Sequence, residues 1–365
     1  MNAPTLFITG ATGFLGGMVL TRLLETRADC RLLLLARAAS VSEAGARLRR
    51  SVARYLESEL PAAAWERCDL IVGDLATDDP RVRAATHVLH LAANTSFRST
   101  RAVEETNVQG TLALARRLRA AKHLKRFVHV STAYLCGADA PRVVHEEDYP
   151  RSGVRHCVLY TETKAEAETR LREEASALPL VVARPSAVVG HTRLGCGPSA
   201  SLYWYYRALF LLRRIPFSPT AWRDVVPVDY VADALLSLLF KPNLRYPCYH
   251  ISAGETSAGN WPSIAAAFAN CYADHVQEGF RQIDVEALGR EWDRIAPRLG
   301  PGDARRLLTA LQLIWPISAS GVEVFDNGRL RAEGLPPPPA FPTYLERCAS
   351  LPPHRTVCQQ MTDDE

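Results

Sequence analysis

The segment Thr5-Leu-Phe-Ile-Thr-Gly-Ala-Thr-Gly-Phe-Leu-Gly-Gly17 decides the fold, because an apolar run leads directly into glycines at positions 10, 13 and 16. We interpret it as a strand, a tight turn and a helix over Phe14–Thr26. In a dinucleotide-binding turn the first glycine reverses the chain, the second lets backbone N–H groups approach a pyrophosphate, and the third lets the helix pack on the strand. The cofactor contacts predicted here are Thr9, Gly10, Thr12, Gly13, Phe14, Leu15 and Gly16.

Composition narrows the class of protein. A chain of 365 residues that is 47% hydrophobic and 22% charged is long enough for a nucleotide-binding core and a smaller second domain. The net charge of +4 comes from scattered Lys and Arg residues, so we expect no nucleic-acid partner. The nine cysteines form no C-x-x-C pair, which argues against a zinc site or a disulfide framework, and we expect no metal.

Hydrophobic patterning bears on localisation. The first apolar run begins within five residues of Met1, which leaves no room for a signal peptide. No run approaches the ~18 apolar residues of a membrane span. We therefore expect a cytoplasmic protein with no integral membrane segment.

The second predicted strand, Cys30–Ala36, is a continuous apolar run suited to a parallel strand buried on both faces. Arg37 stands at its exit. An acidic side chain at this position accepts the ribose hydroxyls of NAD, whereas an arginine can bind a 2′-phosphate, so Arg37 predicts NADPH. Arg47, in the helical stretch Glu43–Leu60, is either a second phosphate ligand or a solvated surface group.

Two further strands supply candidate contacts for the cofactor. Leu70–Leu75 presents Asp74, which either accepts the adenine amino group or is an ordinary turn aspartate. Thr86–Asn94 ends in small residues that leave space for adenosine and pyrophosphate, and Asn107 opens the next helix, where it can fix neighbouring loops. We therefore add Asp74, Leu75, Ala92, Ala93, Asn94 and Asn107 to the predicted contacts.

The fifth predicted strand, Arg126–Val130, delivers Thr132 to the carboxyl edge of the sheet, where open α/β proteins place their chemistry. Tyr160 and Lys164 are four apart on a helix and so lie on one face. The lysine, with an oxidised nicotinamide, should lower the pKa of Tyr160 and bind the nicotinamide ribose, while Thr132 donates to a substrate carbonyl oxygen. We predict catalytic roles for Thr132, Tyr160 and Lys164, the last two also touching the cofactor.

The sixth strand, Leu180–Ala183, is followed by a bend that Pro185 enforces, and a nicotinamide ring could rest there. Pro185, Ser186 and Val188 complete the predicted cofactor contacts. The aromatic segment Leu202–Leu212 is interpreted as part of a substrate flap. Its side chains either line an acyl pocket or simply pack against one another; they are Trp204, Tyr205, Phe210 and Leu211.

The predicted fold class is α/β. Residues 1–190 and 224–254 are expected to form an NADP-binding Rossmann domain with a doubly wound parallel sheet. Residues 191–223 and 255–350 are expected to form a smaller, mainly helical substrate-binding region, and 351–365 a flexible tail.

Together these motifs resemble the thioester reductase and fatty acyl reductase ("male sterility") branch of the extended short-chain dehydrogenases, over roughly residues 5 to 255. The resemblance rests on Thr9–Gly16, Leu35–Arg37, His90–Phe97, Val130–Tyr134, Tyr160–Lys164, Arg184–Ser186 and Val226–Tyr230.

The resemblance implies that Thr132, Tyr160 and Lys164, with NADPH, reduce an acyl thioester to an aldehyde and sometimes on to an alcohol. The implied partner is the acyl thioester itself, on CoA or on an acyl or peptidyl carrier protein. Two alternatives stay open: an extended-branch enzyme acting on a non-thioester carbonyl or a sugar nucleotide, and a regulator that only binds the dinucleotide.

Overall fold

The computed structural model describes residues 3–97, 101–272, 278–350 and 355–362. The chain forms two compact units, each built from three separate segments. The first unit comprises Met1–Leu135, Leu159–Pro185 and Asp229–Tyr249; the second comprises Cys136–Val158, Ser186–Val228 and His250–Glu365. This division places 186–190, 224–228 and 250–254 with the second unit, and it differs most from our expectation in placing Cys136–Val158 there as well. The reason is a strand pairing, in which Val143 and Val144 lie beside Val324 and Phe325.

The first unit is organised by a seven-stranded sheet in the order β12-β7-β5-β4-β1-β2-β3, and its strands from β3 to β7 pair in parallel. The chain runs from β1 outward through β2 and β3, then returns to β4 and continues in the opposite direction. The predicted doubly wound Rossmann topology is confirmed. Its strands are β1 (Thr5–Thr9), β2 (Arg31–Ala36), β3 (Cys68–Val72), β4 (His87–His90), β5 (Arg126–Val130), β7 (Leu180–Pro185) and β12 (Cys248–Ile251).

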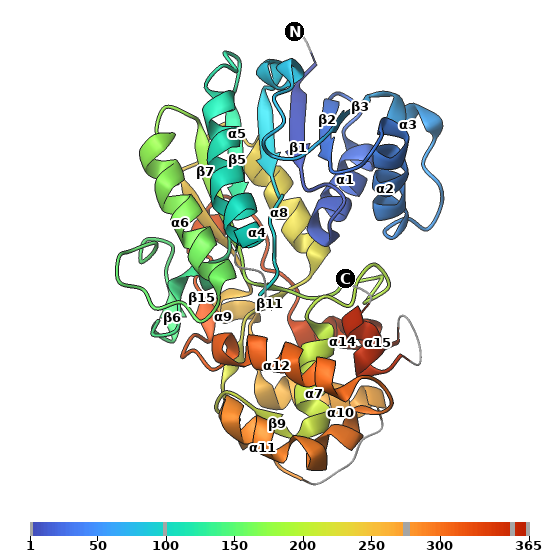
Figure 1. Ribbon diagram of the computed structural model, residues 1–365, viewed down its shortest axis with the longest axis vertical. Helices are drawn as coiled ribbons and strands as arrows, with labels where there is room; N and C mark the ends of the chain where they lie inside the picture. Colours follow the sequence, from blue (N-terminus) through green and yellow to red (C-terminus); the bar gives the residue numbers. More distant parts are fainter. Residues whose placement is uncertain (1–2, 98–100, 273–277, 351–354, 363–365) are drawn as a thin grey trace. The chain divides into compact units, whose positions relative to one another are not determined.

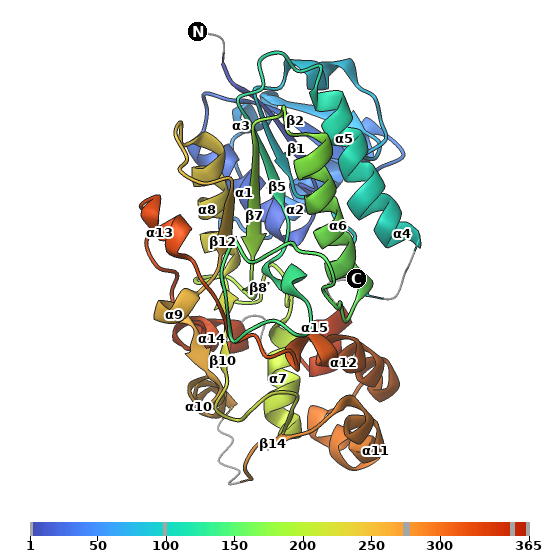
Figure 2. The same cartoon turned by 90° about the vertical axis from the view of Figure 1, so that its left-hand side faces the viewer.

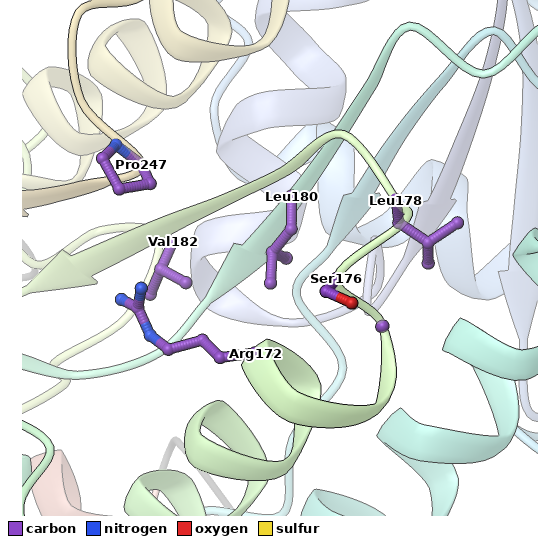
Figure 3. Close-up of a pocket in the computed structure, with 7 residues that line it drawn as sticks. Arg172, Ser176, Leu178, Leu180, Val182 and Pro247 are labelled. Atoms are coloured by element: carbon purple, nitrogen blue, oxygen red, sulfur yellow. The ribbon is translucent and has the colours of Figure 1, made fainter.

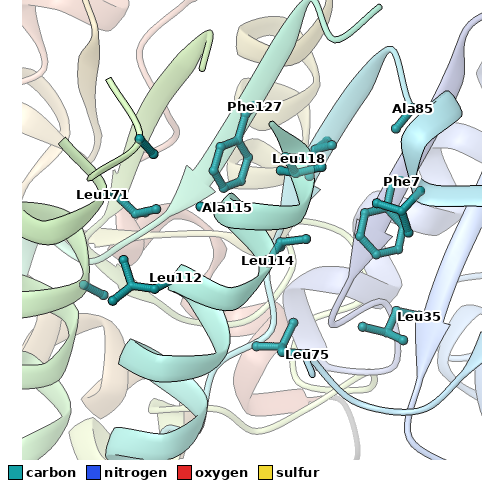
Figure 4. Packing of buried hydrophobic residues seen from close by; sticks show 14 of the residues in the cluster. Phe7, Leu35, Leu75, Ala85, Leu112, Leu114, Ala115, Leu118, Phe127 and Leu171 are labelled. Carbon is teal, nitrogen blue, oxygen red and sulfur yellow. The ribbon is translucent and has the colours of Figure 1, made fainter. Parts of the chain in front are cut away.

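Helices cover both faces of this sheet, with α5 and α6 on one side and α1 and α8 on the other (Figure 2). Apolar side chains from α5, α6 and the strands fill the first face, where Leu112, Leu171 and Phe127 lie in one cluster (Figure 4). The helices are α1 (Phe14–Thr26), α2 (Val41–Ala53), α3 (Ala62–Glu66), η1 (Pro80–Ala84), α4 (Arg101–Glu104), the π-helical turn η2 (Glu105–Gly110), α5 (Thr111–Leu118), η3 (Ala133–Cys136), α6 (Leu159–Glu174) and α8 (Val228–Phe240).

The second unit is mainly helical, and the strands that pair within its described residues are two residues long (Figure 1). Its helices are α7 (Tyr203–Leu212), α9 (Gly254–Ser257), α10 (Trp261–Tyr272), α11 (Val285–Ile295), η4 (Ala296–Leu299), α12 (Ala304–Ser318), α13 (Gly328–Ala332), α14 (Phe341–Ser350) and α15 (Val357–Thr362). Its strand pairs are β6 (Val143–Val144) with β15 (Val324–Phe325), β8 (Ala187–Val188) with β11 (Val225–Val226), β9 (Arg214–Ile215) with β14 (Arg281–Gln282), and β10 (Trp222–Arg223) with β13 (Gly259–Asn260).

Two segments of this unit bear on the sequence-based expectations. Eight side chains of helix α7 are buried and Phe210 stacks on Phe268 with ring centroids 5.3 Å apart, which agrees with the alternative that its aromatic side chains pack against one another. In the segment expected to be a flexible tail, helix α15 packs Val357 out of solvent. The remaining tail residues, 351–354 and 363–365, lie outside the described residues. Within the described ranges, no helix combines the length and apolar character that crossing a membrane requires.

Candidate functional site

The glycine turn between β1 and α1 is shaped by two of its glycines, while the third leaves room. Gly10 has φ +78°, and a Cβ there would lie 2.6 Å from the Ala92 backbone nitrogen. A Cβ on Gly16 would overlap the Gly10 carbonyl oxygen. Gly13 is different, since the nearest atom to its added Cβ is 3.5 Å away. Packing therefore requires Gly10 and Gly16, and Gly13 keeps the approach to the turn free of a side chain.

This turn fits a dinucleotide pyrophosphate. Gly13 is the N-cap of α1 and is exposed, and no side chain caps the first N–H groups of that helix. Unsatisfied N–H groups at a helix N-terminus are suited to bind an anion. Thr9 plays a supporting part, because its Oγ1 accepts from the Ala92 N–H (3.2 Å) and bonds with His90 Nδ1 (2.7 Å). Of the other turn residues, Thr12, Phe14 and Leu15 are half-buried.

Two guanidinium groups lie at the exit of β2. Arg37 is exposed there, and the guanidinium of Arg47 donates to the Arg37 carbonyl oxygen, which holds Arg47 at the same place. The carboxylate of Glu43 is engaged in capping α2, since it accepts from the Ala39 N–H (2.8 Å). The β2 exit is therefore positively charged at the position where an adenosine ribose lies in this fold.

Asp74 and Asn107 have local structural roles. The Asp74 carboxylate accepts from the Ala76 N–H (2.8 Å), as in an ordinary turn, although the residue is exposed at the end of β3 and next to buried Leu75. Asn107, which is 1% exposed, accepts from the Asn94 N–H (2.8 Å) and donates to the Asn94 carbonyl (3.0 Å) and to Thr163 Oγ1 (3.1 Å).

Asn107 therefore joins the β4 exit to helix α6 rather than pointing an unused amide at a ligand. It shapes the predicted site indirectly, through the position of Asn94. The small residues Ala92 and Ala93, which precede Asn94, are half-buried at the same exit.

The three predicted catalytic residues all belong to the first unit. Thr132 is the second residue after β5; its Oγ1 accepts from the Tyr134 N–H (3.2 Å), and its hydroxyl hydrogen-bonds Tyr160. Phe97 meets the Tyr160 ring edge-on, with centroids 6.1 Å apart. Burial raises the pKa of Tyr160 to about 12, and the hydrogen bond from Thr132 opposes this rise. Tyr160 is therefore protonated at neutral pH and can serve as a proton donor.

Lys164 lies one turn beyond Tyr160 and is 2% exposed. Its Nζ donates to the Val130 carbonyl oxygen (2.7 Å), which fixes the ammonium at the carboxyl end of β5. Burial lowers the pKa of Lys164 to about 8, and the charge of Glu168 opposes that shift. In the ligand-free protein burial sets the direction of the Tyr160 pKa shift. The lowering expected from Lys164 together with an oxidised nicotinamide stays a prediction.

Several groups around this site were missed by sequence reasoning. The His129 ring lies 5.4 Å from that of His90, and neither nitrogen of fully buried His129 has a partner among the described residues. Burial holds the pKa of His129 well below its ordinary value. Glu168 and Arg184 form a fully buried ion pair one turn beyond Lys164. For Glu168 a sequence signal was available, because a spacing of four places residues 160, 164 and 168 on one helix face.

The predicted nicotinamide contacts divide between the two units. Pro185 ends β7 in the first unit. Ser186 and Val188 belong to the second unit, where the Ser186 N–H donates to the Ile251 carbonyl (3.0 Å) and the Val188 carbonyl accepts from Ser201 Oγ (2.7 Å). Of the predicted acyl-pocket residues, Leu211 is half-buried, and three are buried within the second unit: Trp204, Tyr205 and Phe210.

A separate cavity of about 250 Å³ lies in the first unit, where Leu180 and Val182 of β7 meet Arg172 of α6 (Figure 3). Leu180 begins β7, so this cavity is near the amino ends of the parallel strands. Thr132 follows the carboxyl end of β5, at the opposite edge of the sheet. The cavity is therefore not part of the catalytic edge.

A glycine turn at the reversal point of a doubly wound sheet, with a tyrosine and lysine on one helix face at the same strand ends, defines an extended short-chain dehydrogenase/reductase fold. The chain matches the family described as "Male sterility protein", a family of NAD-binding domains, over residues 8–235. It belongs to that family.

Individual relatives agree with this assignment. The chain is 26% identical over 314 residues to human "Fatty acyl-CoA reductase 2", covering 71% of this chain and 60% of that protein. It is 24% identical to "Putative fatty acyl-CoA reductase CG8303" of Drosophila melanogaster, covering 79% of this chain and 62% of that protein. The chain thus spans about three fifths of the length of these curated relatives.

Among solved structures, the chain resembles the terminal R domain from the myxalamid PKS-NRPS biosynthetic pathway. The TM-score is 0.75 at 23% identity, over 96% of this chain and 90% of that one. At this identity the likeness establishes the fold.

Proposed function

We propose that this protein is an NADPH-dependent oxidoreductase that reduces an acyl thioester to an aldehyde. The observation that carries the proposal is the pair of hydroxyls on Thr132 and Tyr160, hydrogen-bonded at the carboxyl edge of the sheet one helical turn from the Lys164 ammonium. The similarity to proteins named fatty acyl-CoA reductases supports a thioester as the substrate. A second reduction to the alcohol belongs to the same proposal, as does a cytoplasmic location.

The chemistry needs a hydride and a proton, and the nicotinamide supplies the hydride when bound. In the ligand-free protein the Thr132 and Tyr160 hydroxyls bond to each other. With a substrate bound, both would donate to the carbonyl oxygen that develops negative charge, and two such donors stabilise an oxyanion. Tyr160, protonated at neutral pH, gives its proton to that oxygen. Lys164 stays fixed by the Val130 carbonyl and offers its remaining N–H groups to the ribose.

The thioester suits these residues. Hydride addition to its carbonyl carbon, with proton transfer from Tyr160, gives a hemithioacetal. Breaking the carbon–sulfur bond of that species then releases a thiol and leaves the aldehyde, so orientation and oxyanion stabilisation are sufficient for the reaction. The thiol belongs to CoA or to an acyl or peptidyl carrier protein.

The preference for NADPH is proposed from the β2 exit. Arg37 is exposed there beside Arg47, and Glu43 is occupied by its bond to Ala39. Two guanidinium groups without a competing carboxylate at the strand end favour a 2′-phosphate over a free ribose hydroxyl.

The proposed function is tested by incubating the protein and NADPH with medium- and long-chain acyl-CoA and acyl-carrier thioesters. Aldehyde is trapped with a hydrazine while free thiol is measured, and the two should appear together. Free aldehydes and ketones are assayed in parallel. Efficient reduction of a free carbonyl compound with no thiol release from any thioester would reject the thioester assignment and favour the alternative carbonyl substrate.

A further inference from the structure

Helix α6 carries a second buried charge on the face of Tyr160 and Lys164. Glu168 follows Lys164 at a spacing of four residues, and its side chain is fully buried. The residues at 160, 164 and 168 therefore lie along one face of the helix, which is the face packed on the sheet. An ionised carboxylate costs several kcal/mol to bury unless it is paired. The buried Glu168 carboxylate therefore requires a cationic partner.

Arginine provides that pairing. Arg184, on β7 and also fully buried, places Nη2 2.5 Å from Glu168 Oε1 and Nε 3.0 Å from Oε2. Arg172 adds two more contacts to Oε1, from Nη2 at 2.8 Å and from Nε at 3.2 Å. Burial alone would raise the pKa of Glu168, yet the two arginines hold it below its ordinary value. Because arginine does not lose its proton in proteins, Glu168 stays ionised throughout the working pH range.

The Glu168 carboxylate follows Lys164 by one helical turn on the same buried face of α6, so its negative charge favours the charged form of the lysine. Burial brings the pKa of Lys164 down to about 8, and Glu168 is the charge that opposes this fall. Two other titratable groups face Lys164, His90 from β4 and His129 from β5. Burial lowers the pKa of both, so both are neutral near pH 7 and provide no counter-charge.

We propose that Glu168, clamped by Arg184 and Arg172, is a positioning residue that keeps Lys164 in its charged form one helical turn from Tyr160. The inference rests on the proposed function for its activity readout. The charge state of Lys164 is a property of the folded protein and can be measured without turnover.

The chain is well suited to that measurement, because it holds only four lysines, Lys122, Lys125, Lys164 and Lys241. Of these only Lys164 is buried. Lysine labelled with ¹³C at Cε therefore gives four NMR signals whose shifts report each ammonium group. The Lys164 signal is the one lost in Lys164→Arg.

The test is the titration midpoint of Lys164 in Glu168→Gln. We expect the midpoint to fall by roughly one pH unit or more, the scale on which a nearby charge moves the pKa of a buried group. In the wild type, activity should decline on the alkaline side as Lys164 deprotonates. In the variant this limb moves to lower pH, so that kcat/KM falls roughly tenfold at about pH 9 and stays within about twofold at pH 6.

The matched control is Glu166→Gln, which removes the same charge from the same helix. Glu166 is exposed and pairs with Arg170 at 3.3 Å, so its loss should leave the Lys164 midpoint unchanged. If Glu168→Gln does not fold, the double variant Glu168→Gln/Arg184→Met removes the cation left unpaired, and the midpoint should still fall.

The possible outcomes separate the two proposals. A Lys164 midpoint that stays at its wild-type value in folded Glu168→Gln or in the double variant overturns the role of Glu168, whatever the enzyme reduces. A midpoint that falls in a protein whose wild type reduces no thioester supports Glu168 and rejects the thioester substrate. A uniform loss of activity at every pH, with no change in the midpoint, would mean that the ion pair is purely structural.

Discussion

The two units bury their charged groups for different purposes. In the first unit, Lys164 and Glu168 follow from helical spacing, and they lie beside the strand ends where the glycine turn also sits. In the second unit, Asp224 is 3% exposed and accepts from three backbone N–H groups, those of Ala253 (2.7 Å), Gly254 (3.3 Å) and Phe325 (3.0 Å). One carboxylate there connects segments about a hundred residues apart in the sequence.

The contrast predicts that substitutions in the two units affect different properties of the protein. The first unit has a regular sheet that aligns side chains at one edge, so a change at that edge should alter a rate or an affinity. In the described part of the second unit the paired strands are two residues long, and single side chains such as that of Asp224 bind distant backbone groups. A change to one of those side chains should alter stability.

The sharpest test of this contrast is Tyr160→Phe. The ring stays in place against Phe97 while the proton donor is lost, so turnover should fall by roughly 10²- to 10⁴-fold. Cofactor affinity and the unfolding midpoint should remain near the wild-type values. Steady-state kinetics measure turnover, a cofactor titration measures affinity, and a thermal melt measures the unfolding midpoint. A variant that kept most of its activity would reject Tyr160 as the acid, and Tyr134 would be tested next.

The counterpart in the second unit is Asp224→Ala. Three buried N–H groups would lose their acceptor, and the free energy of unfolding should fall by about 3–5 kcal/mol. Urea denaturation followed by circular dichroism measures this. Asp293→Ala, at an exposed position in α11, is the control and should change stability by less than about 0.5 kcal/mol. Equal effects of the two substitutions would break the contrast.

Two glycines of the turn in the first unit should respond differently to substitution: one should affect stability and the other cofactor affinity. Gly16→Ala places a Cβ against the Gly10 carbonyl oxygen and should lower the free energy of unfolding by roughly 1–3 kcal/mol. Gly13→Ala has space for its Cβ and should change stability by less than about 0.5 kcal/mol, while weakening dinucleotide binding. Thermal melts and a cofactor titration compare them. Gly13→Ala with unchanged affinity would argue against a pyrophosphate at this turn.

The narrowest expected effect is that of Arg37→Ala, which should change the affinity for one cofactor and not for the other. Loss of a charge-assisted phosphate contact should weaken NADPH binding by about ten- to a hundred-fold, equivalent to ~1.5–3 kcal/mol, and leave NADH binding nearly unchanged. Arg49→Ala is the control, because Arg49 lies on α2 with its guanidinium over the Trp65 ring. Fluorescence titrations with NADPH and NADH measure the two affinities. Equal losses of affinity for the two cofactors would reject a 2′-phosphate at Arg37.

Local patterns made most of the first unit predictable. The bounds of α1 and β5 match the residue ranges predicted from apolar periodicity and glycine position. The shared face of Tyr160 and Lys164 likewise follows from a spacing of four in a helix. The pKa of Tyr160 did not follow, because it depends on how deeply α6 is buried, and burial is a property of the packed sheet.

What could not be predicted depends on contacts distant in the sequence. Asn107 was expected to fix neighbouring loops, but its partners Asn94 and Thr163, which lie 13 and 56 positions away, could not be named from the sequence. Asp224 gave no local signal, since its three acceptor bonds reach residues 29 to 101 positions away. The aromatic side chains of helix α7 could face either a ligand or a core, and periodicity does not distinguish these alternatives.

The interleaving of the two units has a consequence for how the polypeptide can be made and recombined. The chain alternates between the units in six segments. A growing chain that ends at Leu135 has neither Tyr160 nor Lys164, and the edge strand β12 is complete only when Ile251 has been added. No single proteolytic cut releases either unit as one piece. A chimaera that exchanges only the residues after 255 with a relative would carry over part of the second unit and leave Cys136–Val158 and Ser186–Val228 behind, so exchanging the whole second unit requires five crossover points.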